Sequence, residues 1–149
     1  MAFDQTRANG RAARVEVARG MLAHGFLDRP LRLFLENAAH VRAEDWSLLS
    51  ERLIADGRLE EAVYVCRTGG IELPRAELLA RGDQELRRRD IDAAIHHYEL
   101  AEASRERWEA LLDVLIGLPN RELTARAIAR KHLVDDARIA APLPLAASA

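Results

Sequence analysis

Apolar residues follow one another at steps of three and four along most of this chain, which is the spacing of an amphipathic α-helix. The steps run through residues 11–138 and are interrupted at intervals by glycine, proline or polar residues. Gly25, Gly57 and Arg89 occupy equivalent breaks, each 32 residues from the next. The pattern predicts an all-α chain of eight helices, arranged as four antiparallel hairpins.

Residues that begin or end helices lie beside these breaks. Gly25, Gly57 and the pair Gly69-Gly70 lack a Cβ atom, so they accommodate the left-handed backbone that commonly ends a helix. Side chains that cap the start of a helix are expected at four positions, which are Asp28, Asp45, Asp90 and Asn120.

Large and small residues recur at matching places in the predicted hairpins. One copy contains Trp46, Leu49, Gly57 and Ala62, with Ser50 beside Leu49; the next contains Leu78, Gly82, Ala94, Tyr98 and Ala101; a partial third contains Trp108, Leu111 and Leu115. We expect Gly82 and Ala94 to lie where the two helices of their hairpin touch closely. Hairpins this short cannot each bury a core, so they must pack on one another.

This pattern resembles the tetratricopeptide repeat (TPR), whose signature is W-x2-L-G-x2-Y, a small alanine and then A-x3-F over about 34 residues. The resemblance covers residues 11–135 and is closest over 44–118, while the shorter period of 32 leaves related helical-hairpin repeats open. It implies a TPR-like α-solenoid over 11–138, a right-handed superhelix of about four antiparallel helix hairpins. Residues 1–10 lack a helical period and 139–149 contain two prolines, so both ends are expected to be flexible.

The resemblance also implies that the first helix of each hairpin lines a concave groove for a peptide or partner helix. By spacing from Trp46, Leu78 and Trp108, the groove residues would be Glu44, Ser47, Glu51, Ile54, Ala76, Leu79, Asp83, Leu86, Arg87, Glu106, Glu109, Asp113 and Ile116. Six of these are carboxylates and one is an arginine, which suits a basic segment of a partner protein. The alternative is an ordinary solvated helix face.

Composition narrows the classes of function. The chain has 149 residues, 49 % of them hydrophobic, which fits one domain. Its net charge of −2 produces no general attraction to nucleic acid or anionic lipid. No apolar run approaches the roughly 20 residues needed to span a bilayer, and no signal peptide is apparent, so a cytoplasmic location is expected.

We find no catalytic constellation in the sequence, and no cofactor or metal is expected. His96 and His97 are adjacent, so on a helix they point about 100° apart and cannot chelate one ion together. The histidines are expected on helix surfaces, and Cys66, the only cysteine, is expected to be a small buried apolar residue.

The sequence therefore predicts a non-catalytic protein-interaction module: an adaptor, an assembly chaperone or an accessory subunit of a bacterial-type complex. Val15, Val17, Met21 and Leu22 lie close together in the first hairpin, which allows a homo-oligomer through that end. The alternative is a DNA-binding regulator, because residues 122–139 loosely resemble a helix-turn-helix. The other interpretation of that segment is a helix that caps the last hairpin.

Overall fold

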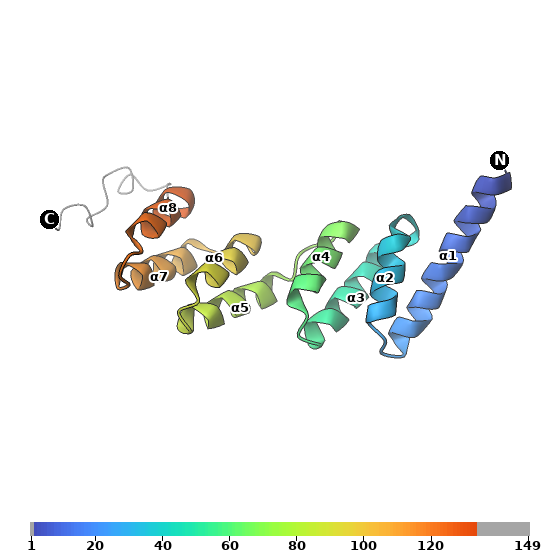
Figure 1. Cartoon of the computed structure of the whole chain (residues 1–149), viewed down its shortest axis with the longest axis horizontal. Coiled ribbons are helices and arrows are strands. Elements are labelled where there is room, and N and C mark those ends of the chain that lie inside the picture. Colours follow the sequence, from blue (N-terminus) through green and yellow to red (C-terminus); the bar gives the residue numbers. More distant parts are fainter. Residues whose placement is uncertain (1, 134–149) are drawn as a thin grey trace. The chain divides into compact units, whose positions relative to one another are not determined.

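The computed structural model describes residues 2–133, and this part of the chain is helical throughout, with no β-strand. The tail predicted at 139–149 lies outside the described residues. Figure 1 shows the elements, which are α1 (Ala2–Ala23), α2 (Asp28–Glu36), the short 3₁₀ helix η1 (Ala38–His40), α3 (Ala43–Ala55), α4 (Leu59–Gly69), α5 (Arg75–Arg87), α6 (Ile91–Leu100), α7 (Arg105–Ile116) and α8 (Glu122–His132). None of these helices combines the length and the apolar character that crossing a membrane requires.

The chain divides into two compact units, of which the first contains residues 1–77 and the second begins at Leu78. In the first unit, α1 packs against α2 and α3 packs against α4; in the second, α7 packs against α8. The helices α5 and α6 are joined through side chains, because the Tyr98 hydroxyl donates a hydrogen bond to Asp83 and His97 contacts Glu85. Neighbouring helices thus associate in antiparallel pairs, as the sequence predicts.

The backbone repeats the sequence period. Gly25, Gly57 and Arg89 all have positive φ, at 89°, 79° and 62°, which confirms that they occupy equivalent turns. Gly70 and Glu102 are also 32 residues apart, and they too have positive φ, at 63° and 49°, in the turn after the second helix of a pair. L-residues rarely adopt this conformation, so the connection itself imposes it on Arg89 and Glu102.

Several helix starts differ from the prediction. Asp28 is the first residue of α2 and makes no capping hydrogen bond. Asp45 lies inside α3, where its carboxylate accepts a hydrogen bond from the backbone N–H of Arg42 at 2.9 Å. Asp90 precedes α6 without a side-chain cap, and Asn120 occupies a left-handed turn with φ of 61°. Local sequence alone predicts these short polar side chains as caps, but the Asp28 carboxylate forms an ion pair with the distant Arg58 instead.

The first helix begins at Ala2 rather than near residue 11, so residues 2–10, which show no helical period in the sequence, are helical. Residues 4–10 are mostly exposed, which explains why no apolar period marks them. A helix that is already nucleated extends at little cost through residues of good helix propensity such as alanine and arginine.

The helix pairs within each unit share one apolar core. In the first unit the buried cluster comprises Val15, Ala18 and Leu22 of α1, Phe34 of α2, Trp46, Leu49 and Leu53 of α3, and Ala62 and Val65 of α4. In the second it comprises Ile91, Ala94 and Tyr98 of α6, Trp108, Leu111 and Leu115 of α7, Ala125 and Ile128 of α8, and Leu133. The cores confirm the apolar positions expected from the repeat.

An edge-to-face aromatic contact joins one pair to the next in each unit. Phe34 of α2 meets Trp46 of α3 with ring centroids 5.8 Å apart. Tyr98 of α6 meets Trp108 of α7 at 5.6 Å. Such pairs contribute about 0.5–1.5 kcal/mol beyond the area that they bury.

Glycines let the two helices of a pair approach closely beneath two of these rings. A Cβ atom on Gly69 would lie 2.4 Å from Cγ of Trp46, and one on Gly82 would lie 2.5 Å from Cε1 of Tyr98. The prediction that Gly82 lies at a close helix contact is confirmed. The Tyr98 ring cannot move aside easily, because it is buried and its hydroxyl is held by Asp83.

We therefore expect Gly82→Ala to lower the free energy of unfolding by about 1–3 kcal/mol through overpacking, although alanine favours a helix by about 1 kcal/mol over glycine. The matched control is Gly10→Ala in α1, where an added Cβ meets nothing within 4 Å, so helix propensity acts alone and stability should rise. Urea unfolding followed by circular dichroism measures both changes. Equal stabilisation by the two substitutions would contradict the close contact.

Candidate functional site

A pocket of about 390 Å³ lies in the first unit, and we call it the acidic pocket. Its lining residues come from α3, from the segment that connects α4 to α5, and from the first turn of α5. They are Ser47, Ser50, Glu51, Ile54, Ile71, Glu72, Pro74 and Glu77. Three carboxylates and two hydroxyls therefore surround a partly apolar lining that contains no basic side chain.

Local sequence places each group of lining residues. On α3 they stand at i, i+3, i+4 and i+7, which is one face of a helix. The left-handed Gly70 ends α4, and the Ile71 N–H donates a hydrogen bond back to the Cys66 carbonyl at 3.0 Å. Ile71 packs against the first core, and Pro74 directly precedes α5, so Glu77 arrives within the first turn of that helix.

The carboxylates of the acidic pocket have no partner among residues 2–133. Glu51, Glu72 and Glu77 are all exposed. In the described part of the chain, no hydrogen bond or ion pair engages any of them. Because like charges stand together without a counterion, the pocket has a local negative potential that favours a cation.

Of the groove residues expected on α3, Ser47, Glu51 and Ile54 line the acidic pocket, and Glu44 is exposed outside it. The remaining pocket residues that carry charge, Glu72 and Glu77, were missed. Glu72 lies in the segment between Gly70 and α5, and Glu77 lies in the first turn of α5. The groove was predicted from the spacing of residues along first helices, and that spacing selects neither position.

The groove residues expected on α5 are mostly engaged inside the second unit. Asp83 accepts a hydrogen bond from the Tyr98 hydroxyl at 2.6 Å and two from the Arg107 guanidinium at 3.1 and 3.2 Å. Leu79 and Leu86 pack against the core, whereas Ala76 and Arg87 are exposed. Burial opposes ionisation of Asp83, but the hydrogen bonds from Arg107 and Tyr98 outweigh it and hold the pKa of that carboxyl below its usual range.

The groove residues expected on α7 are exposed, and none of them lines the acidic pocket. Glu109 accepts a hydrogen bond from Arg105 of its own helix at 2.9 Å. Glu106, Asp113 and Ile116 also face solvent, with Ile116 53 % exposed. The structure thus brings the predicted residues of α3 together in a pocket and does not do so for those of α7.

Ion pairs between helix pairs recur in the two units, and the sequence analysis missed them. Arg19 of α1 donates two hydrogen bonds to Asp45 of α3, at 2.8 and 2.7 Å, as Arg107 of α7 does to Asp83 of α5. Burial acts to raise the pKa of Asp45, but Arg19 and the Arg42 N–H hold it below its usual value. In each unit a bidentate arginine therefore bridges the first helices of successive pairs.

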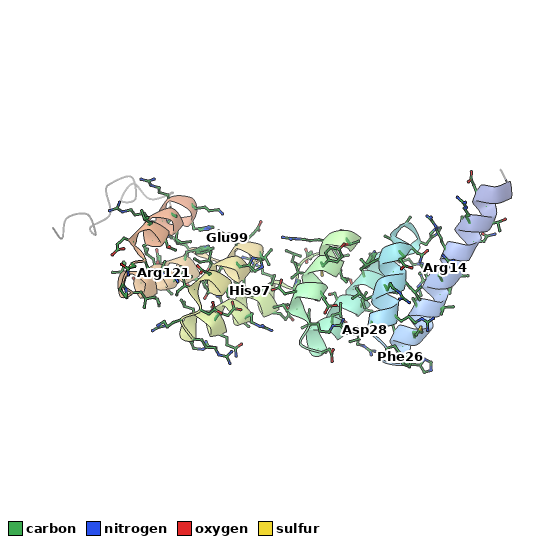
Figure 2. All side chains as sticks on the ribbon, viewed as in Figure 1. Arg14, Phe26, Asp28, His97, Glu99 and Arg121 are labelled. Atoms are coloured by element: carbon green, nitrogen blue, oxygen red, sulfur yellow. The ribbon has the colours of Figure 1, made fainter. Side chains whose placement is uncertain are left out.

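A second kind of bridge joins the starts of the second helices. Arg58, just before α4, lies 2.7 Å from Asp28 of α2. Arg121, just before α8, lies 3.5 Å from Asp92 of α6, at the equivalent place (Figure 2). The arginine follows its aspartate by 30 residues in one unit and 29 in the other, so a search for opposite charges near the repeat period would have found them.

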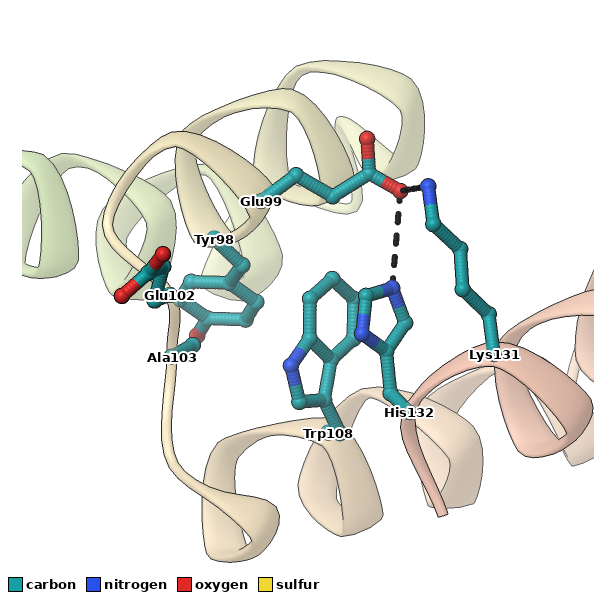
Figure 3. A pocket seen from close by; sticks show the side chains of 7 residues that line it. All are labelled: Tyr98, Glu99, Glu102, Ala103, Trp108, Lys131 and His132. Atoms are coloured by element: carbon teal, nitrogen blue, oxygen red, sulfur yellow. Dashed lines mark hydrogen bonds and ion pairs between the residues drawn. The ribbon is translucent and has the colours of Figure 1, made fainter. Parts of the chain in front are cut away.

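A second pocket, of about 290 Å³, lies among α6, α7 and α8 (Figure 3). The His132 ring stacks on Trp108 with centroids 3.6 Å apart and planes 5° apart. Nζ of Lys131 lies 2.9 Å and Nε2 of His132 3.4 Å from the same oxygen of Glu99. Burial lowers the pKa of His132, although Glu99 opposes this. The Glu99 carboxylate of this pocket is therefore already paired with Lys131 and His132.

Two histidines differ from the expectation that they lie on helix surfaces. His97 is only 5 % exposed, and its Nδ1 lies 2.7 Å from a carboxylate oxygen of Glu85 and 3.0 Å from the Ala93 carbonyl (Figure 2). His132 is half-buried on Trp108. Sequence spacing did not show that a neighbouring helix supplies a carboxylate for His97. Cys66 is buried, as predicted.

The outer helices bear on two further expectations. In α1, Val15 and Leu22 belong to the core, whereas Val17 is 59 % exposed. In α8, Ala125, Ile128 and Ala129 are buried, which fits a helix that covers the apolar face of α7 at the end of the second core. Residues 134–139, which would contain the second helix of a DNA-binding motif, lie outside the described residues.

Comparison of the chain with protein-family models, with curated proteins and with solved structures finds no match.

The Asp83 network generates a pH-dependent prediction. A carboxyl whose pKa is lower in the folded state stabilises the fold at pH values above its ordinary pKa of 3.8. This contribution is lost as the pH falls through the pKa of the folded state. We expect Asp83→Asn to lower the free energy of unfolding by about 1–2 kcal/mol at neutral pH, with a smaller difference from the parent at acidic pH.

Urea unfolding at pH values above and below the ordinary pKa of an aspartate carboxyl provides the measurement. Asp113→Asn, at an exposed site on α7, is the control and should change stability little at any pH. A difference between Asp83→Asn and its parent that stays constant with pH would show that the Asp83 charge contributes nothing.

Proposed function

We propose that this chain is a non-catalytic protein-interaction module of TPR-like helix pairs stacked as a right-handed superhelix, and that its acidic pocket binds a basic segment of a partner protein. The repeating turns support the first part, because a period of 32 in the backbone conformation is typical of a helical-hairpin array. The aromatic and ionic contacts that recur in the two units support it as well.

The acidic pocket is the observation that carries the second part. The half-buried acids Asp45, Asp83 and Glu85 are paired with an arginine or a histidine, whereas the exposed carboxylates of Glu51, Glu72 and Glu77 are engaged by no described residue. The pocket offers charge and an apolar surface rather than reaction chemistry, because neither Ser47 nor Ser50 hydrogen-bonds to a base within the described residues. Such a surface suits a lysine or arginine side chain, whose alkyl stem and charged end are recognised separately.

The scaffold around the acidic pocket favours binding by a preorganised surface. The α3 residues of the pocket alternate with Trp46, Leu49 and Leu53, which are fixed in the core. A partner segment would therefore lose its own freedom on binding while the module loses little.

The DNA-binding alternative remains a prediction that no observation favours. It requires Arg126, Arg130 and Lys131 of α8 to contact phosphates, but Lys131 is paired with Glu99 and Arg126 is half-buried.

Neutralising the acidic pocket tests the proposal. We expect the triple substitution Glu51→Gln, Glu72→Gln and Glu77→Gln to weaken binding of a lysine- and arginine-rich peptide by about tenfold or more at low salt. Fluorescence anisotropy of the labelled peptide measures the affinity at several salt concentrations.

The control carries an equal change in charge outside the pocket, at the exposed residues Asp4, Asp56 and Glu122. It should lose only the small part of the affinity that arises from net charge. Equal losses in the two triple variants, or no binding by the parent protein, would reject the acidic pocket as the binding site.

A further inference from the structure

Ser50 adds a neutral hydrogen-bonding group to the acidic pocket, and the inference drawn from it rests on the proposed function. This residue is 94 % buried, since its exposed fraction is 6 %. Its hydroxyl makes no hydrogen bond with any described residue. The oxygen is nevertheless not sealed off, because no inaccessible side-chain polar atom in the described part of the chain lacks a partner. Since Ser50 lines the acidic pocket, its hydroxyl is open to a ligand there.

The three carboxylates are spread around the pocket. Glu51 lies on α3, Glu72 in the connecting segment and Glu77 on α5. Their oxygens do not converge within 4.8 Å of one another, so they do not form a ready site for one metal ion. A ligand that meets them together with Ser50 must donate hydrogen bonds in several directions. A guanidinium group has five N–H donors in a planar fork, whereas an ammonium is a compact point charge.

The rest of the lining also discriminates between the two cations. Ile54, Ile71 and Pro74 are apolar and half-buried. A guanidinium is more weakly hydrated than an ammonium, so it loses less hydration free energy against such a surface. The alkyl stem of the same side chain can cover these residues.

We propose that the acidic pocket is an arginine-selective site. The guanidinium of a partner side chain enters it, meets the carboxylates of Glu51, Glu72 and Glu77, and donates one N–H to the hydroxyl of Ser50. The partner is accordingly a protein segment that presents arginine in an exposed, extended or helical stretch.

Peptides that differ only in the basic side chain test this selectivity. Three probes of equal length contain arginine, lysine or the uncharged arginine isostere citrulline at the same positions, separated by glycine and serine. We expect the arginine peptide to bind about tenfold more tightly than the lysine peptide at equal salt, and the citrulline peptide not to bind. Equal affinities for arginine and lysine would overturn the selectivity while leaving the proposed function intact; absence of binding by all three would overturn both.

Substitution of Ser50 tests its part separately. Ser50→Ala should reduce the preference for arginine over lysine about threefold or more, with the lysine affinity unchanged, because only the hydrogen bond to the guanidinium is lost. Thr68→Ala, at an exposed position on α4 outside the acidic pocket, is the matched control and should leave the preference unaltered. Thermal unfolding confirms that both variants remain folded. A preference that survives Ser50→Ala unchanged would show that the hydroxyl takes no part.

Discussion

The structure depends on apolar burial that successive helix pairs must share. No pair contains enough apolar surface to enclose a core, and in each unit the buried cluster draws on helices from two pairs. The edge-to-face contacts of Phe34 with Trp46 and of Tyr98 with Trp108 lie where one pair meets the next. Within the pairs α3–α4 and α5–α6, Gly69 and Gly82 permit the close approach of the two helices beneath Trp46 and Tyr98. The acidic pocket is positioned by helices whose apolar faces are already buried in these cores.

Charge pairing adds specificity around these cores. The Arg19–Asp45 and Arg107–Asp83 bridges span first helices, and the Arg58–Asp28 and Arg121–Asp92 bridges span the starts of second helices. Partly exposed pairs of this kind contribute modestly to stability, but each fixes which faces of two helices meet. A chain with 22 basic and 24 acidic residues can satisfy many acids internally. Within the described residues, the three carboxylates of the acidic pocket take part in none of these pairs.

The acidic pocket takes part of its lining from the connection between two helix pairs. Gly70 turns the chain out of α4, Ile71 anchors the connection to the core, and Pro74 leads into α5. Two of the three carboxylates, Glu72 and Glu77, belong to this connection and to the helix turn that follows it. The helix α3 supplies Glu51 together with the buried hydroxyl of Ser50. Ser50 stands 32 residues before Gly82, so one departure from the repeat pattern introduces the polar group at the pocket.

The sequence by itself determined the helices, their 32-residue period, the equivalent turns at Gly25, Gly57 and Arg89, and the close contact at Gly82. It also placed Ser47, Glu51 and Ile54 on one face of α3, because helical spacing depends only on local backbone geometry. Only the tertiary structure decided that Asp83 is held by Arg107 and Tyr98, that His97 is buried against Glu85, and that Glu72 and Glu77 join the acidic pocket. The physical reason is that spacing fixes the direction of a side chain about its own helix, whereas its partner depends on how distant segments pack.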